Sequence, residues 1–88
     1  MAYKVEVGGG VAKQLRKLSP DAQKAVIDLL DILAQNPRPH GCKKLKGTDR
    51  ARYRARRGNF RVIYEIYDDQ LLVLVLAVGD RKEVYRYG

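Results

Sequence analysis

The stretch Arg52–Tyr67, RYRARRGNFRVIYEIY, decides the fold. Polar and apolar residues alternate on both sides of Gly58-Asn59, which is the pattern of two strands joined by a tight turn. A two-residue loop with glycine first suits a type II′ turn, and the turn then fixes how the strands pair. We therefore expect Arg56 to lie directly opposite Arg61.

The same register sorts the side chains of this hairpin into two faces. One face is predicted to be a core face, formed by Tyr53, Ala55, Phe60, Val62, Tyr64 and Ile66. The other face holds Ile63 and Glu65 together with the arginines Arg52, Arg54, Arg56 and Arg61. Like charges directly opposite one another destabilise a sheet. Either these arginines bind something negative, or they form a solvated surface that keeps the protein soluble.

Length and charge limit the class of protein. The chain has 88 residues, of which 45% are hydrophobic and 32% charged, so we expect one domain over residues 1–88. The net charge is +8, and ten Lys or Arg residues lie between Arg38 and Arg61 with only one acid, Asp49, among them. Such a patch suits nucleic acid, the ribosome, an acidic protein or an anionic membrane surface.

Cysteine and histidine content argues against a disulfide or a metal site. Cys42 is the one cysteine in the sequence, which excludes an intramolecular disulfide and fits a reducing cytoplasm. His40 and Cys42 give too few ligands for zinc, so we expect no metal and no other cofactor. No apolar run reaches the roughly 18 residues that a membrane span needs. We therefore expect a cytoplasmic protein that does not enter a membrane.

The chain before the hairpin predicts one strand and two helices. Apolar and polar residues alternate over Tyr3–Val7, which predicts a strand with Tyr3, Val5 and Val7 facing inward. Gly8–Gly10 is expected to be a flexible joint between this strand and the first helix. A first helix is expected over residues 11–17 and a second from the capping sequence Ser19-Pro20-Asp21 to about Gln35. Their apolar stripes are Val11, Leu15 and Leu18 in the first, and Ala22, Val26, Leu29, Leu30 and Leu33 in the second.

The remaining segments complete an α+β fold. Residues 38–49 are expected to form an irregular basic loop with Leu45 as its apolar anchor. Asp68-Asp69 marks a turn before the apolar run Leu71–Val78, which predicts a central strand buried on both faces. The predicted architecture is an N-terminal strand, a helical hairpin and a three-stranded antiparallel meander, with one sheet and the helices packed on one of its faces.

The strand predicted over Leu71–Val78, with the residues that follow it, is expected to place side chains on the basic face. A three-residue turn places Ala77 opposite Arg61 and brings Arg81 to the same surface. The basic face has no paired carboxylates and no Ser–His pair, so arginine and tyrosine are what remains for chemistry. Guanidinium groups can hold an RNA phosphate while the RNA 2′-hydroxyl supplies the nucleophile. A tyrosine with a lowered pKa can move a proton, although composition alone favours a core or edge position for Tyr85.

Over nearly its whole length, and most specifically between Lys43 and Tyr85, the chain resembles the RelE/ParE superfamily of bacterial and archaeal toxins. The segments that carry the resemblance are KKLKG, YRARRGNFRVIYEI and LLVLVLAVGDRKEVY. The resemblance implies a RelE-like fold and the toxin of a type II toxin–antitoxin system. It implies an mRNA interferase, a ribosome-dependent endoribonuclease that cuts A-site codons through the substrate 2′-hydroxyl without metal.

The resemblance also assigns roles to individual residues. The candidate catalytic residues are Arg61, Arg81, Tyr85, Arg54 and Arg56. Among them Arg61 matches the family's phosphate-binding arginine, Arg81 the arginine of its V-G-x-R motif and Tyr85 its proposed proton-transfer tyrosine. Residues expected to bind RNA or the ribosome are Lys43, Lys44, Lys46, Arg50, Arg52, Arg57, Lys82 and Arg86.

The implied partners are an acidic RelB-like antitoxin, the A site of the 30S ribosomal subunit with its mRNA, and operator DNA for the toxin–antitoxin complex alone. Three alternatives stay open from the sequence. The chain can be a ParE-like inhibitor of DNA gyrase, an inactive relative that only binds its antitoxin, or a plain nucleic-acid-binding module. The retained tyrosine, Tyr85, and the full arginine set favour the RelE branch.

Overall fold

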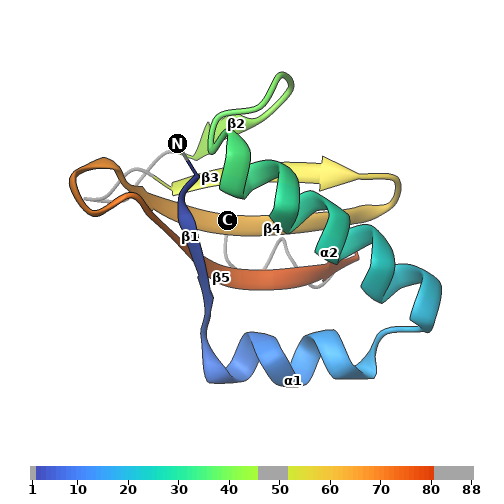
Figure 1. The fold of residues 1–88 in the computed structure, drawn as a ribbon. Coiled ribbons are helices and arrows are strands. Elements are labelled where there is room, and N and C mark those ends of the chain that lie inside the picture. Colours follow the sequence, from blue (N-terminus) through green and yellow to red (C-terminus); the bar gives the residue numbers. More distant parts are fainter. Residues whose placement is uncertain (1, 46–51, 81–88) are drawn as a thin grey trace.

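The computed structural model describes residues 2–45 and 52–80 of the chain. Figure 1 shows two helices packed on one face of a single sheet. The elements are β1 (Lys4–Val7), α1 (Gly9–Lys17), α2 (Pro20–Gln35), β2 (Lys43–Leu45), β3 (Arg52–Arg57), β4 (Phe60–Tyr67), the short 3₁₀ helix η1 (Asp68–Gln70) and β5 (Leu72–Asp80). The five strands lie in the order β1-β5-β4-β3-β2. The predicted α+β class is confirmed, and β2 adds a strand within the loop that was expected to be irregular.

The N-terminal strand lies at one edge of the sheet. β1 pairs with β5 in parallel, whereas the other neighbouring strands are antiparallel. The predicted inward position of Val7 is wrong, because this side chain is 41% exposed. The helical cover reaches β1 at its other end, where the N–H of Tyr3 donates to the carbonyl of Ala34 at 2.7 Å. Val7 therefore lies beyond that cover.

The three glycines do not form a loop of their own. Gly9 and Gly10 make the first turn of α1, and the N–H of Ala12 donates to the carbonyl of Gly8 at 3.0 Å. The expected flexible joint is thus wrong for two of the three residues. The hydrogen bond to Gly8 shows that the helix begins directly where the strand ends.

The second helix begins as the sequence predicts. The hydroxyl of Ser19 accepts a hydrogen bond from the N–H of Ala22 at 3.2 Å, and Pro20 occupies the first turn. Its buried residues are Ala22, Val26, Leu29 and Leu33, and Leu30 is half-buried. Figure 1 shows α2 crossing the sheet while α1 runs along β5, so the two helices diverge after Ser19.

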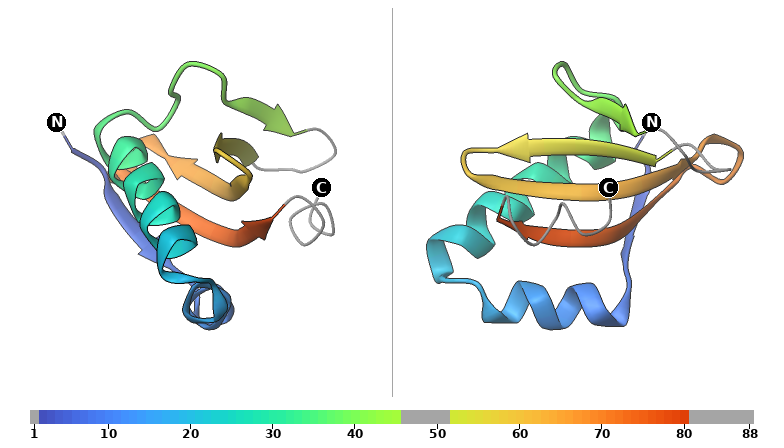
Figure 2. Two further views of the ribbon diagram at one scale, coloured as in Figure 1. Left: turned by 90° about the vertical axis from the view of Figure 1, so that its right-hand side faces the viewer. Right: turned by 180° about the vertical axis from the view of Figure 1, so that it is seen from behind.

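The predicted core face of the hairpin packs under these helices. Ala55, Val62 and Tyr64 are buried together with Val73, Val75 and Val78 of β5 and with the helical residues Val11, Val26, Leu29 and Leu33. Tyr53, Phe60 and Ile66 are half-buried against this core. Seen from behind, the strands lie in front of α2 (Figure 2). The basic face of the hairpin is therefore the face turned away from the helices.

The predicted pairing of β4 with β5 is wrong by two residues. Gly79, not Ala77, lies opposite Arg61, and Ala77 lies opposite Ile63. The connection is one residue longer than expected, because Leu71 extends η1 in a left-handed conformation (φ 49°). A β-bulge beside Ile63 then adds a second residue. A shift of one residue moves a side chain to the other face of a strand, and a second shift moves it back. Ala77 therefore stays on the basic side of the sheet.

The outer face of β5 is only partly covered, which corrects the expectation of a strand buried on both faces. Leu72, Leu74 and Leu76 are half-buried. A small apolar cluster does exist on this face, formed by Ile63, Ala77, Leu45 and Leu76. Leu45 is thus the apolar anchor that the sequence indicates, and it belongs to β2.

Candidate nucleic-acid interface

The β3–β4 hairpin forms the centre of the candidate site. Gly58 has a φ of 61°, and Asn59 is not at positive φ, which is the sign pattern of a type II′ turn. Arg56 lies opposite Arg61 as predicted. The turn therefore places two guanidinium groups on adjacent strands of one face.

Four basic side chains surround one small pocket beside this pair. The pocket has a volume of about 120 Å³ and is lined by Gly41, Lys43, Arg54, Ala55, Arg56 and Arg61; we call it the basic pocket. Arg54 and Arg61 are half-buried, and Arg56 and Lys43 are exposed. Pairing of Lys43 with Arg54 across β2 and β3 adds the lysine to the same face. Planar guanidinium groups gathered in this way can hold a phosphate bidentately.

Arg52 belongs to a different local arrangement on the same face. Its Nε donates to Glu65 at 3.0 Å, as the predicted register requires, and Glu65 is 5% exposed. The hydroxyl of Tyr67 donates to the other carboxylate oxygen of Glu65 at 2.8 Å. Much of the charge of Arg52 is thereby matched locally, and Arg52 is not among the residues that line the basic pocket.

The remaining candidates fall into two groups. Lys44 lies opposite Tyr53, and Arg57 lies opposite Phe60, so both occupy the register positions of the helix-covered face. The structure does not bring these two residues to the basic pocket. Six other candidates lie outside the described residues: Lys46, Arg50, Arg81, Lys82, Tyr85 and Arg86.

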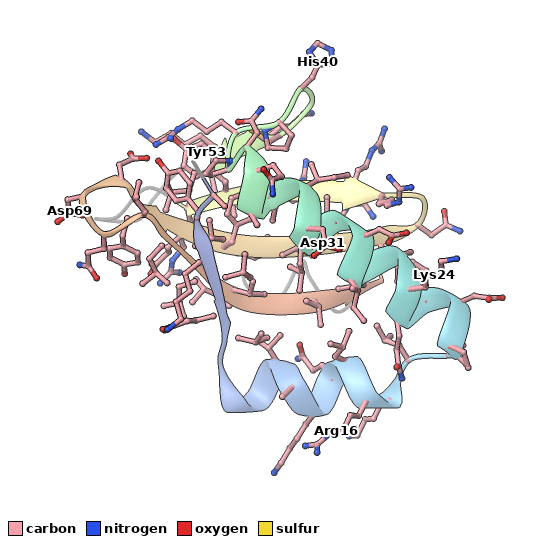
Figure 3. All side chains as sticks on the ribbon, viewed as in Figure 1. Arg16, Lys24, Asp31, His40, Tyr53 and Asp69 are labelled. Carbon is pink, nitrogen blue, oxygen red and sulfur yellow. The ribbon has the colours of Figure 1, made fainter. Side chains whose placement is uncertain are left out.

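A polar cluster that the sequence did not reveal anchors the loop leading into β2. Arg38 donates twice to Asp68, at 3.1 and 2.9 Å, and its guanidinium lies 5.4 Å from the ring centre of Tyr53. The hydroxyl of Tyr3 donates to the same carboxylate at 2.7 Å. Hydrogen bonds from Arg38 and then Tyr3 lower the pKa of Asp68 to about 2. Figure 3 shows Tyr53 where this loop meets the sheet.

Tyr64, a buried residue of β4, anchors the same loop from the core. Its hydroxyl donates to the carbonyl of Pro37 at 2.7 Å, and its ring stacks on Tyr53 with 5.9 Å between centres. Burial raises the pKa of Tyr64, so this hydroxyl is a donor and not a proton-transfer group. The sequence predicts only a core position for Tyr64. The loop that carries Gly41 to Lys43 is therefore fixed at its start by two independent contacts, Arg38–Asp68 and Tyr64–Pro37.

The far end of β5 is held beside Arg61 by α1. β1 pairs with β5 only as far as Val75, and among residues 2–45 and 52–80 no other strand pairs with the next part of that edge. There the side-chain oxygen of Gln14 accepts a hydrogen bond from the N–H of Val78 at 3.3 Å. Gly79, the residue opposite Arg61, follows directly. Gln14 thus fixes the strand that pairs with the pocket arginine.

Histidine and cysteine take no visible part in the basic pocket. Figure 3 shows His40 at the tip of the loop, pointing away from the sheet, and Cys42 is half-buried with a free thiol. Within residues 2–45 and 52–80, no three His, Cys, Asp or Glu side chains gather as metal ligands. No helix in the described part of the chain is long and apolar enough to cross a membrane.

Comparison with known proteins places this geometry in a family. Residues 9–85 match the sequence profile of a family described as the ParE toxin of the type II toxin–antitoxin system parDE. The chain belongs to the RelE/ParE toxin superfamily. Toxin RelG of Mycobacterium tuberculosis is 32% identical over 87 residues, covering 98% of this chain and 99% of that protein. The mRNA interferase toxin RelE of Escherichia coli K12 is 30% identical over 88 residues, with 97% and 92% covered.

Solved structures agree with the RelE-like fold. The archaeal RelE–RelB complex from Pyrococcus horikoshii aligns with a TM-score of 0.80 at 32% identity, covering 92% of this chain and 97% of that one. That structure contains a RelB antitoxin bound to the toxin. The chain is therefore a RelE-like toxin of a type II toxin–antitoxin system.

Proposed function

We propose that this RelE-like toxin is a ribosome-dependent endoribonuclease that cuts mRNA in the A site. The observation that carries the proposal is the basic pocket, where Arg54, Arg56, Arg61 and Lys43 surround a space of about 120 Å³. Four cationic side chains favour a phosphate and repel a metal ion, so the chemistry is proposed to proceed without metal. The similarity to a toxin named an mRNA interferase supports the same reaction.

The proposed reaction uses the substrate as its own nucleophile. The 2′-oxygen of the RNA attacks the adjacent phosphorus, the bond from phosphorus to the 5′-oxygen breaks, and a 2′,3′-cyclic phosphate and a 5′-hydroxyl remain. Arg54 and Arg61 hold the non-bridging oxygens, and their charge stabilises the negative charge that builds there. Arg56, the exposed arginine of the pocket, adds a third positive charge beside the phosphate.

Proton transfer is assigned to the part of the chain that follows β5. The 2′-hydroxyl must lose a proton and the 5′-oxygen must gain one. We assign this transfer to Tyr85 and a further phosphate contact to Arg81, on the resemblance of V-G-x-R and E-V-Y to the family motifs. Gln14 and the pairing of Gly79 with Arg61 orient the strand that leads to these residues.

The other basic residues are proposed to bind the ribosome and mRNA. Lys43 belongs to the basic pocket itself. Lys44 and Arg57 are exposed cations at register positions of the helix-covered face. Lys46, Arg50, Lys82 and Arg86 extend the same charge in the sequence. Association with RNA that depends on such contacts weakens steeply as salt rises.

An acidic RelB-like antitoxin is the proposed partner in the resting state. The Pyrococcus horikoshii relative was solved with RelB, and so was the Escherichia coli relative in the intact RelBE complex. A chain with a net charge of +8 attracts an acidic partner. We propose that the antitoxin covers the basic pocket and that the complex, not the toxin alone, binds operator DNA.

Primer extension on mRNA from a translation reaction tests the ribonuclease proposal. The expected result is a set of discrete 3′ ends within codons, seen only when ribosomes and toxin are both present. Cuts in naked RNA, or no cuts while growth still stops, would contradict it.

A second candidate function is inhibition of DNA gyrase. The observation in its favour is that the matching family profile is that of the ParE toxin over residues 9–85. The toxin would then dock on gyrase through the same basic face. Inhibition of supercoiling by purified gyrase, together with intact mRNA in the translation reaction, is the result that would favour this candidate.

A further inference from the structure

A second hollow lies beside the basic pocket, between α2, the loop before β2 and the open edge of β3. It has a volume of about 340 Å³; we call it the side groove. Its apolar walls come from Leu29, Ile32 and Pro39. It shares Gly41, Ala55 and Arg56 with the basic pocket, so the two spaces adjoin.

The side groove exists because β2 stops pairing too early to cover β3. The last pair in that direction is Lys43 with Arg54, and continuing the same register would place Gly41 opposite Arg56. Gly41 instead adopts a φ of 90°, and the chain turns away in a loop in which Cys42 donates to the Pro39 carbonyl at 3.1 Å. In the described part of the chain, the edge of β3 is therefore left open at Arg56.

The open edge presents one backbone donor and one acceptor. Arg57 and Phe60 flank the two-residue loop, so they form a hydrogen-bonded pair, and the next pair, Arg56 and Arg61, does not exchange backbone hydrogen bonds. The N–H and C=O of Arg56 must then point away from β4, toward the side groove. Within the described residues, no strand pairs with Arg56 on that side. A backbone polar group in such a position needs a partner.

We propose that the side groove binds the base of a nucleotide whose phosphate lies in the basic pocket. Every nucleobase carries a donor and an acceptor side by side on its edge, which complements the N–H and C=O of Arg56. The faces of the base would lie against the apolar walls at Ile32 and Pro39. Arg56 lines both the basic pocket and the side groove, so one residue would contact both halves of the nucleotide.

The size of the side groove suits this ligand. Small-molecule sites range over roughly 300–1,000 Å³, and the groove lies near the lower end, enough for one base but not for a stack of bases. The inference rests on the proposed function and deepens it, because it names a nucleotide next to the bound phosphate as a group that the toxin reads.

Calorimetric titration of the purified toxin separates the two halves of the ligand. The probes are inorganic phosphate and the four nucleoside 3′-monophosphates. We expect at least one monophosphate to bind about tenfold more tightly than phosphate, since apolar contact and the hydrogen bonds of the base add to the phosphate contacts. Ile32→Trp fills the groove and should abolish this difference while leaving phosphate affinity unchanged.

A matched control lies on the same helix. Ile27 is exposed and does not line the groove, so Ile27→Trp should retain the full difference between monophosphate and phosphate. A second readout needs no variant: the backbone amide resonance of Arg56 should shift on adding the monophosphate and stay in place with the same concentration of phosphate.

Equal affinities for monophosphate and phosphate would overturn the proposal, and so would an unaltered difference in Ile32→Trp. If Ile32→Trp keeps nucleotide binding but weakens binding of the antitoxin, the groove is a protein-docking site and the proposal is also wrong. None of these measurements requires cleavage. Failure of the ribonuclease proposal would instead appear in primer extension, so the two failures are distinguishable.

Discussion

Replacing Arg56 by glutamine should make the folded toxin more stable while weakening its hold on anions. Arg56 lies opposite Arg61 on adjacent strands, and both side chains line the basic pocket. Glutamine keeps the length and polarity of the side chain on an exposed strand position but removes its charge. The repulsion between the two guanidinium groups is then lost.

The magnitude follows from Coulomb's law at a solvated surface. Cα atoms of such a pair are about 4.5 Å apart, and long side chains let the charged heads separate to roughly 7 Å. Two unit charges at that distance repel by about 0.6 kcal/mol in a water-like dielectric. Screening at about 0.1 M salt reduces this to about 0.3 kcal/mol. The expected gain for Arg56→Gln is therefore about 0.3–0.6 kcal/mol at low salt, within the range measured for cross-strand pairs.

Urea unfolding at low salt and at about 1 M salt measures this gain, which should vanish at the higher concentration. Arg57→Gln is the matched control, because Arg57 lies opposite Phe60 and has no cationic partner across the strand. Its effect should be close to zero in both conditions. If Arg56→Gln were no more stable than Arg57→Gln at low salt, or if its gain persisted at high salt, the reasoning about paired arginines would be refuted.

Three further predictions concern the parts of the fold that support the site. Tyr64→Phe should cost about 1–3 kcal/mol in urea unfolding, because the buried Pro37 carbonyl loses its donor, whereas Tyr53→Phe should cost well under about 1 kcal/mol. Gly10→Ala should stabilise by about 0.5–1 kcal/mol in thermal melts, since Gly10 is helical and a Cβ there meets nothing within 4 Å. In Asp68→Asn, the free energy of unfolding should fall less steeply as the pH is lowered into the acid range. The folded pKa of about 2 lies below the ordinary 3.8, so this stabilisation is complete above that ordinary value and is lost as pH falls through about 2.

The hairpin could be predicted because its register is local. Gly58-Asn59 sets the pairing of residues that are close in sequence, and the alternation of Arg54, Ala55 and Arg56 then fixes the two faces. The Ser19 cap is similarly local, and the helix that it starts lies where the pattern placed it. In both cases the information sits within a few residues of the structure that it determines.

The misplaced features depend on contacts that are distant in sequence. The pairing of β5 requires the length of the η1 connection and the bulge beside Ile63, and neither is visible in the apolar run itself. The Arg38–Asp68 contact joins residues that are 30 apart. In the sequence, Arg38 indicates only a charged loop residue and Asp68 only a turn. Gly41 carried a weak signal, because a glycine after Pro-His in a loop favours positive φ.

The most direct test of the central claim is the rate at which ribosome-bound mRNA is cut by toxin in excess, measured for Arg61→Ala and Arg16→Ala. Both variants remove one arginine, but Arg16 lies on the exposed side of α1 (Figure 3). Arg61, in contrast, lines the basic pocket. If Arg61 stabilises the charge on the scissile phosphate, its loss should slow cleavage by roughly 10²–10³-fold. Arg16→Ala should cut at nearly the rate of the unaltered toxin. Equal rates for the two variants would mean that the basic pocket does not hold the phosphate that is cleaved.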